Sequence, residues 1–151
     1  MAFLMKITWS SNGPFRSFVS NGPQAGEKTT WGVIDRAGPG FRSAGDVKFF
    51  REGGLTVGDE GFLIERRGSK RIVAARLKIM DLGEELRDRW QPVYEVVARD
   101  FPNDDLAKIR AMDGRIDALP HFQKNAKGMM LRSFLPLDQA DFDHFKEALD
   151  A

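Results

Sequence analysis

The chain has 151 residues, of which 42% are hydrophobic and 30% charged, a composition typical of a globular domain with a buried core. Its lack of cysteine excludes thiol catalysis, disulfides and cysteine zinc sites, and two histidines argue against a multi-histidine metal centre. The net charge is +1, yet residues 1–80 carry 13 Lys and Arg against 7 Asp and Glu, whereas residues 81–151 carry 10 against 15. We therefore expect a polarised surface with one face suited to a polyanion.

The first third of the chain predicts a strand, a short helix and a second strand. Residues 3–9 are mostly apolar and predict the first strand. Asn12 suits a helix start and Gly22 its end. Residues 29–35 are rich in strand formers and predict the second strand, whereas the Gly and Pro content of residues 37–46 predicts a loop.

The middle of the chain predicts a hairpin followed by another strand. Gly53 and Gly54 mark a turn, and residues 56–59 lead into a strand at 61–66. Residues 67–69, Arg-Gly-Ser, are typical of a hairpin turn, and the return strand covers 71–80. A further strand is expected at 92–100.

The last third is more helical. Asn103 is expected to cap a helix with Asp104 and Asp105 in its first turn, where the helix dipole favours acidic residues. A final strand at 129–137 precedes a closing helix capped by Asp138. The apolar spacing of that helix predicts a buried face made of Ala140, Phe142, Phe145 and Leu149.

These elements predict one α+β domain over residues 1–151, which could be a module of a longer protein. About five or six largely antiparallel strands would form a sheet or a small curved β-barrel, with short helices flanking it. The N-terminal apolar run is too short for a signal peptide because Lys6 interrupts it. Nowhere do 18 apolar residues follow one another, so we expect a soluble, cytoplasmic protein with no membrane contact.

Catalytic motifs are weak. No Gly-x-Ser-x-Gly elbow is present, and the Gly-rich residues 38–43 lack the lysine of a phosphate-binding loop. A magnesium nuclease would need clustered carboxylates with a lysine close by. The candidates are Asp46, Asp59, Glu60 and Glu65, for which turn and strand-edge roles are more common.

Two tryptophans lie at predicted strand ends beside small or polar residues. Trp9 is followed by Ser-Ser-Asn, and Trp31 is followed by Gly32. A tryptophan ring in such a setting can form a flat wall for an unstacked base, whose edge the hydroxyls and the amide can bind. The alternative is that both rings are core anchors, which is the more common role for any single tryptophan.

The segment LTVGDEGFLIERRGSKRIVAARLKIMD resembles the core of the EVE domain, a member of the PUA-like superfamily related to YTH domains. Residues 57–59 and Phe62 match the family's V-G-D-x-x-F pattern, and residues 72–74 match its I-V-G with an alanine in place of the glycine. The segments PVYEVVARDFPNDDLAKIRA and MLRSFLPLDQADFDHFKEAL are similar to later parts of the family. The resemblance covers residues 55–149 well, and residues 30–33 match its W-D-G-V more loosely.

The resemblance implies a PUA-like fold with a pocket for a flipped, chemically modified base. Trp31 would be the stacking wall, and Ser10, Ser11, Asn12 and the Gly32 backbone would line the edge. YTH domains take a second cage aromatic from the loop between the paired central strands. The corresponding loop of this chain, residues 67–70, contains no aromatic residue. The aromatic residues that would substitute for it are Trp9, Phe41 and Trp90. The basic side chains that would hold phosphates are Arg42, Arg66, Arg67, Lys70 and Arg71.

The resemblance favours a non-catalytic reader of modified DNA that takes no cofactor. The base would be a methylated or hydroxymethylated cytosine, and base flipping would be the mechanism. The family further implies a specificity module of a modification-dependent restriction system, with the nuclease fused to it or supplied separately. Three alternatives stay open: an RNA-binding domain that recognises a modified nucleotide, a small metal-dependent nuclease, and a protein-interaction domain with a Phe-rich surface.

Overall fold

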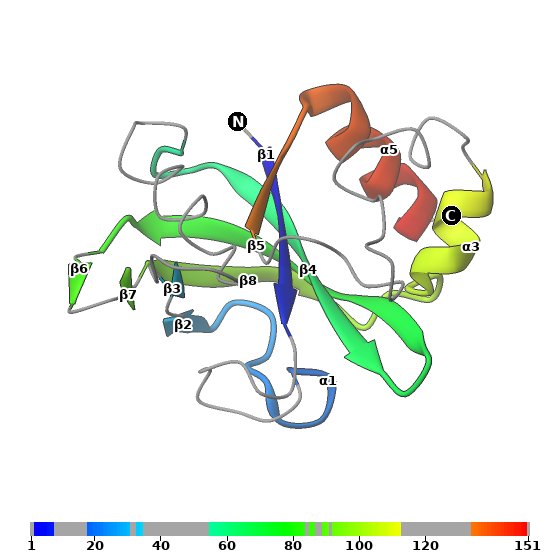
Figure 1. Cartoon of the computed structure of the whole chain (residues 1–151), viewed down its shortest axis with the longest axis horizontal. Coiled ribbons are helices and arrows are strands. Elements are labelled where there is room, and N and C mark those ends of the chain that lie inside the picture. The colour runs from blue at the N-terminus through cyan, green and yellow to red at the C-terminus, as the bar shows by residue number, and fades with distance from the viewer. Residues whose placement is uncertain are drawn as a thin grey trace, which may run out of the picture.

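The computed structural model describes residues 2–7, 18–30, 33–34, 55–83, 85–86, 89–90, 92–112 and 134–150. Its strands are β1 (Ala2–Ile7), β2 (Lys28–Thr30), β3 (Val33–Ile34), β4 (Glu60–Arg67), β5 (Lys70–Asp81), β6 (Glu85–Leu86), β7 (Arg89–Trp90), β8 (Val93–Arg99) and β9 (Phe134–Leu137). Its helices are α1 (Phe18–Asn21), α3 (Leu106–Met112) and α5 (Gln139–Asp150) (Figure 1).

The main layer is a mixed six-stranded sheet with the order β2-β8-β5-β4-β1-β9, and β3, β7 and β6 form a smaller sheet (Figure 1). Among the described strand pairs only β1 and β4 run parallel, which requires the long crossover that carries α1, β2 and β3. The predicted α+β class, with its five or six largely antiparallel strands and flanking helices, is confirmed. Register shifts at Leu63/Ile64, Arg76/Leu77 and Ile79/Asp81 bend the long strands.

The expected single strand at residues 29–35 is wrong. β2 pairs with β8 in the main sheet, whereas β3 pairs with β7 in the small sheet, so the chain changes sheets between them. The sequence carries Gly32 at this break, and a glycine inside a strand pattern often marks such an interruption. The wrong prediction came from strand propensity, which does not say which partner each half of a segment pairs with.

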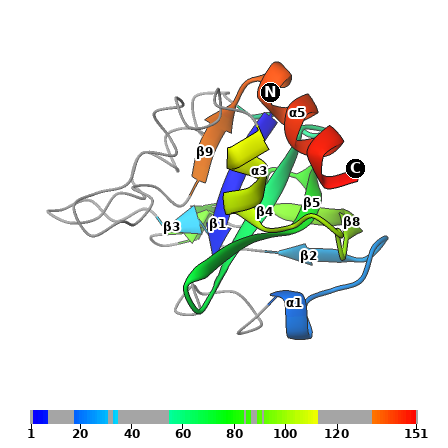
Figure 2. The same cartoon turned by 90° about the vertical axis from the view of Figure 1, so that its right-hand side faces the viewer.

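The alternation of side chains along the strands separates two cores on opposite faces of the sheet. Phe3 of β1 and Leu63 of β4 belong to one core, whereas Leu4 and Phe62 belong to the other. The first core is closed by Phe18 of α1, and the second by α3 and α5. Figure 2 shows α3 and α5 together on one side of the sheet and α1 on the opposite side.

The hairpin after β4 forms as predicted, and residues 56–59 before β4 form a turn of their own, whereas the turn predicted at Gly53 and Gly54 lies outside the described residues. The amide of Thr56 donates to Asp59 Oδ2 at 2.9 Å, and the amide of Gly58 donates to the Ile79 carbonyl at 2.8 Å. Gly58 has a φ of 98° and Gly68, at the hairpin turn, a φ of 60°, a region that glycine adopts without strain. The Val-Gly-Asp segment that carries the family resemblance is therefore a tight turn that starts β4.

The start of α3 differs from the prediction. The helix begins at Leu106, and the amide of Ala107 donates to Asp105 Oδ1 at 2.9 Å, so Asp105 occupies the cap position predicted for Asn103. The reason is tertiary, because the amide of Val73 donates to the Asp104 carbonyl at 2.7 Å and Ile72 forms a β-bridge with Asp105. Residues 104 and 105 therefore pair with β5 before the helix begins.

The closing helix is capped as predicted, because the amide of Asp141 donates to Asp138 Oδ1 at 2.9 Å. Phe142, Phe145 and Leu149 are buried, as is Ala148. The prediction for Ala140 is wrong, since this residue is exposed, whereas the next two residues of the same turn, Asp141 and Phe142, are buried. Among the described residues no helix is long and apolar enough to cross a membrane.

Candidate nucleic-acid interface

The predicted base pocket lies outside the described residues, namely Trp9, Ser10, Ser11, Asn12, Trp31, Gly32 and Phe41. Arg42 of the predicted phosphate contacts lies outside them as well. The strands that lead to the two tryptophans are described: β1 ends at Ile7 and β2 at Thr30. In the main sheet these strands are separated by β4, β5 and β8, so they are not neighbours.

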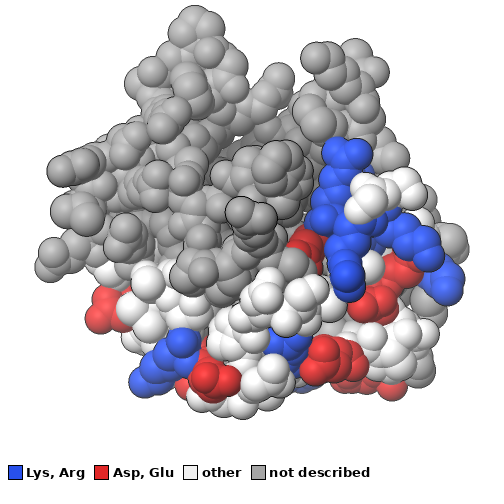
Figure 3. All heavy atoms as spheres, turned by 90° about the horizontal axis from the view of Figure 1, so that it is seen from below, with Lys and Arg blue, Asp and Glu red and all other residues white. Residues whose placement is uncertain are grey.

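The other predicted phosphate contacts come together at the end of the β4–β5 hairpin, which we call the basic hairpin. Its register places Arg66 opposite Arg71 and Arg67 opposite Lys70. Arg66, Arg67 and Lys70 are exposed, and Arg71 is partly buried. The largest group of blue spheres in Figure 3 lies on the right, at the end of the molecule where Figure 1 places this hairpin.

Like charges face each other across the two strands of the basic hairpin. Like charges directly opposite each other across two antiparallel strands are unfavourable, and here two such pairs are consecutive. The Nε of Arg66 donates to the Gly68 carbonyl at 3.1 Å, which draws one guanidinium back along the turn. An anion bound by either pair would relieve the repulsion within that pair, and guanidinium groups match the geometry of phosphate oxygens.

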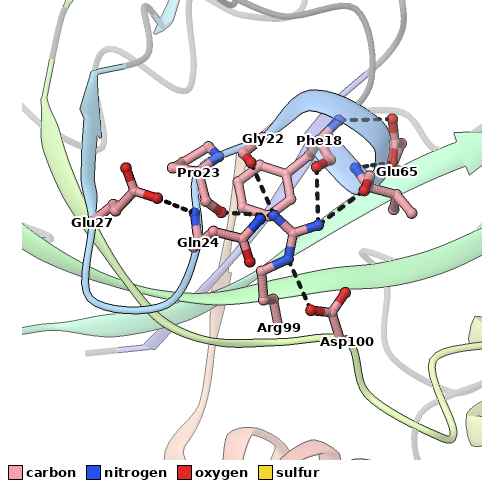
Figure 4. Close-up of polar contacts among 9 residues, drawn as sticks. Phe18, Gly22, Pro23, Gln24, Glu27, Glu65, Arg99 and Asp100 are labelled. Atoms are coloured by element: carbon pink, nitrogen blue, oxygen red, sulfur yellow. Dashed lines mark hydrogen bonds and ion pairs between the residues drawn. The ribbon is translucent and has the colours of Figure 1, made fainter.

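At the base of this hairpin, Glu65 turns into the molecule and binds the first residues of α1. Its Oε1 accepts the Phe18 amide at 3.1 Å and its Oε2 accepts the Val19 amide at 3.2 Å (Figure 4). Glu65 is only 5% exposed. Its carboxylate therefore satisfies amide groups at the start of a helix that have no partner within the helix.

Arg99, at the end of β8, binds the other end of α1. Its guanidinium donates to the carbonyl oxygens of Pro23 at 2.7 Å, Val19 at 2.9 Å, Gly22 at 3.0 Å and Phe18 at 3.4 Å. Its carbon Cζ lies 5.1 Å from the centre of the Phe18 ring, and its Nε lies 3.2 Å from Asp100 Oδ2 (Figure 4). One buried cation thus binds four carbonyl oxygens of α1 and of the turn that follows it.

Sequence reasoning missed both ends of this arrangement. The sequence indicates Glu65 only as a candidate nuclease carboxylate and indicates no role for Arg99. The available signal was a charge that follows a continuous apolar run, Phe-Leu-Ile before Glu65, inside a strand. A buried charge needs a partner, but the sequence does not say which one.

The nuclease alternative is not supported by the described carboxylates. Glu65 is bound by α1, Asp59 caps the turn before β4, and Glu60 lies 3.5 Å from the Nε of Arg76. No cluster of three or more His, Cys, Asp or Glu side chains that could hold a metal occurs in the described part of the chain. These three carboxylates are thus engaged separately and do not converge on one ion.

One polar atom in the core beneath α1 has no hydrogen-bond partner among the described residues. It is the buried hydroxyl of Tyr94 on β8, whose ring centre lies 6.3 Å from that of Phe3. Burial raises the pKa of Tyr94, because the phenolate would be desolvated.

The arrangement of elements matches solved structures of one fold. A crystal structure of human THYN1 in complex with DNA containing 5-methylcytosine matches with a TM-score of 0.64 and 18% identity, covering 99% of this chain and 98% of that one. A protein from Pseudomonas syringae matches with a TM-score of 0.63 and 17% identity, covering 97% and 98%. The DUF55 domain of human thymocyte nuclear protein 1 matches with a TM-score of 0.62 and 16% identity, covering 97% of each chain.

No protein-family model matches the sequence, and no curated protein matches it. The structural likeness extends over nearly the whole chain at low identity, so it concerns the fold. The chain has the EVE-type, PUA-like fold that the resemblance implied.

Proposed function

We propose that this domain of EVE-type fold is a non-catalytic reader of modified DNA. The observation that carries the proposal is the basic hairpin, whose cationic side chains oppose one another in pairs at an exposed end of the molecule. A protein keeps such a conflict where it serves binding, since local rules are broken mainly at functional sites. Human THYN1, which has the same fold, is known in complex with DNA containing 5-methylcytosine, and this supports DNA as the partner.

In the proposed mechanism the basic hairpin and Arg42 hold the phosphate backbone. These contacts supply affinity and orientation but no sequence information. The modified base, a methylated or hydroxymethylated cytosine, is flipped out of the duplex, which costs a few kcal/mol of unstacking. Stacking on Trp31 and hydrogen bonds to its edge recover that cost, and the remaining pocket residues are Trp9, Ser10, Ser11, Asn12, Gly32 and Phe41.

The cellular role we propose is that of a specificity module. A reader without its own catalytic centre directs another activity to modified DNA, and the family resemblance suggests a nuclease that is fused to it or acts as a separate protein. This is the organisation of a modification-dependent restriction system, and it places the protein in the cytoplasm.

The test is a binding titration with duplexes that differ in one central base: unmodified cytosine, 5-methylcytosine, 5-hydroxymethylcytosine or N6-methyladenine. Salt is held constant, because phosphate contacts make affinity depend steeply on ionic strength. We expect a clear preference for one cytosine modification, and we expect Trp31→Ala to lose that preference while keeping the affinity for unmodified duplex. Equal affinity for all duplexes would refute the reader function. Tighter binding of a matched modified RNA would show that the domain recognises modified RNA and not modified DNA.

A further inference from the structure

Helix α1 cannot hold its own position. It has four residues, fewer than an isolated helix needs to be stable in water. Within the described residues it is attached to the sheet by the buried ring of Phe18 and by two charged side chains, Glu65 at its start and Arg99 at its end. The position of α1 therefore depends on contacts from two strands, β4 and β8.

A glutamate is unusual at a buried position of a strand such as that of Glu65. It occupies the inward side of a strand whose preceding residues, Phe62 to Ile64, are completely buried. A well-packed apolar side chain is often as stabilising as a buried ionic group, whereas a carboxylate with two separate amide partners imposes one geometry. The two oxygens bind two successive amides, so a small displacement of α1 would break both hydrogen bonds.

Arg99 imposes a geometry in the same way. Its two terminal nitrogens reach carbonyl oxygens of both α1 and the turn that follows it, residues 22 and 23. A planar guanidinium with several fixed donors can do this, whereas the single ammonium of a lysine cannot. The side chain is 7% exposed, so water does not replace these contacts readily.

The same strand joins this attachment to the basic hairpin. Glu65 and Arg66 are consecutive on β4, with Glu65 buried against α1 and Arg66 exposed. Helix α1 also follows β1 in the chain, and the predicted pocket residues 9–12 belong to the segment that connects the two elements. Whatever binds to the hairpin through its phosphates is thereby placed at a defined distance from α1.

We infer that Glu65 and Arg99 are positioning residues that fix the position of α1 relative to the basic hairpin. The phosphate contacts and the recognition of the modified base then occur at a fixed distance from each other. This inference rests on the proposed reader function. Phosphate contacts orient a duplex and base contacts specify it, so an error in the distance between them weakens discrimination more than it weakens general binding.

The experiment uses two conservative variants at opposite ends of α1, Glu65→Gln and Arg99→Lys. Glutamine has one acceptor oxygen for two amides, and lysine lacks the planar group of donors. Their matched controls are Glu60→Gln and Arg76→Lys, which make the same changes in an ion pair between β4 and β5. The readouts are the affinity ratio between the preferred modified duplex and the unmodified one, and the dependence of each affinity on salt.

We expect the affinity ratio to fall about tenfold in both α1 variants, the effect of losing a hydrogen bond to a charged group. Affinity for the unmodified duplex and its salt dependence should stay as in the wild type, and the controls should keep the full ratio. Amide hydrogen exchange at Phe18 and Val19 should become faster in Glu65→Gln.

An unchanged ratio in both variants would overturn the inference, as would equal losses of affinity for modified and unmodified duplex. Failure of both variants to fold, or unaltered exchange at Phe18 and Val19, would equally count against it, because the residues would then not act by positioning α1. A wild-type protein without any preference would instead refute the proposed reader function. The two failures are therefore distinguishable.

Discussion

The two faces of the sheet are closed by different physical means. On one face α3 and α5 pack through apolar side chains, with the ring of Phe62 stacked on Phe142 at 5.0 Å and tilted against Phe145 at 5.6 Å. On the other face α1 contributes Phe18 to the core, but its two ends are held by Glu65 and Arg99. The basic hairpin projects from the strand that carries Glu65.

The two kinds of contact differ in what they contribute: one mainly stabilises the fold, and the other mainly fixes the position of a helix. Apolar packing contributes free energy but tolerates small shifts, because dispersion contacts have little directionality. Hydrogen bonds to buried charges contribute less net stability and define a position. We conclude that the α3–α5 face serves mainly as the scaffold, and that the α1 face carries the geometry on which binding depends.

The largest effect is expected from breaking the scaffold face. Phe145→Ala removes a completely buried ring and should lower the free energy of unfolding by about 4 kcal/mol, through lost transfer energy and a cavity. Urea denaturation measures the loss, and Val57→Ala, at a side chain that is 60% exposed, is the control. Folded Phe145→Ala protein should keep the salt dependence of DNA binding. A changed dependence would contradict the assignment of this face as scaffold.

A smaller effect of opposite sign is expected in the core under α1. Tyr94→Phe removes a buried hydroxyl without a partner and should raise the free energy of unfolding by about 1 kcal/mol. Because the pKa of Tyr94 is raised in the folded state, wild-type stability is complete below about pH 10, where the unfolded tyrosine starts to ionise, and falls as the pH rises further.

Tyr94→Phe should lack this alkaline loss of stability, and denaturation of both proteins between neutral pH and pH 10.5 measures the difference. If the variant is less stable at neutral pH, the hydroxyl has a partner in solution, and the core under α1 is more polar than its described contacts indicate.

The smallest stability effect is expected at the basic hairpin. Lys70→Gln removes one of two like charges that face each other, so the Tm should rise by about 1 °C. The same change should lower the affinity for every duplex and reduce the slope of log K against log salt by about one unit. Lys108→Gln, an exposed lysine on α3, should alter neither quantity. An unchanged salt slope in Lys70→Gln would remove this lysine from the phosphate contacts.

Local features were predictable. The hairpin at Gly68 and the cap by Asp138 both depend on residues within a few positions of one another. The basic hairpin was found for the same reason, because a tight turn brings basic residues on both sides of it together whatever the rest of the fold does. The family resemblance extended this local information to the EVE-type fold.

Non-local features were not predictable. The Glu65 carboxylate binds an amide 47 positions away, and Arg99 binds a carbonyl 80 positions away. The displacement of the α3 cap to Asp105 and the division of residues 29–35 between two sheets also depend on distant strands. Strand propensity and charge patterns carry no information about these partners, because each was selected by the topology of the sheet.

The sequence by itself therefore determined the class of fold, the hairpin and its positive charge, since these follow from side-chain periodicity and short-range turns. Only the tertiary structure decided that a carboxylate beside that charge holds α1, and that an arginine from another strand holds its opposite end. The physical reason is that a buried charge must find partners, and the fold alone brings those partners within hydrogen-bonding distance.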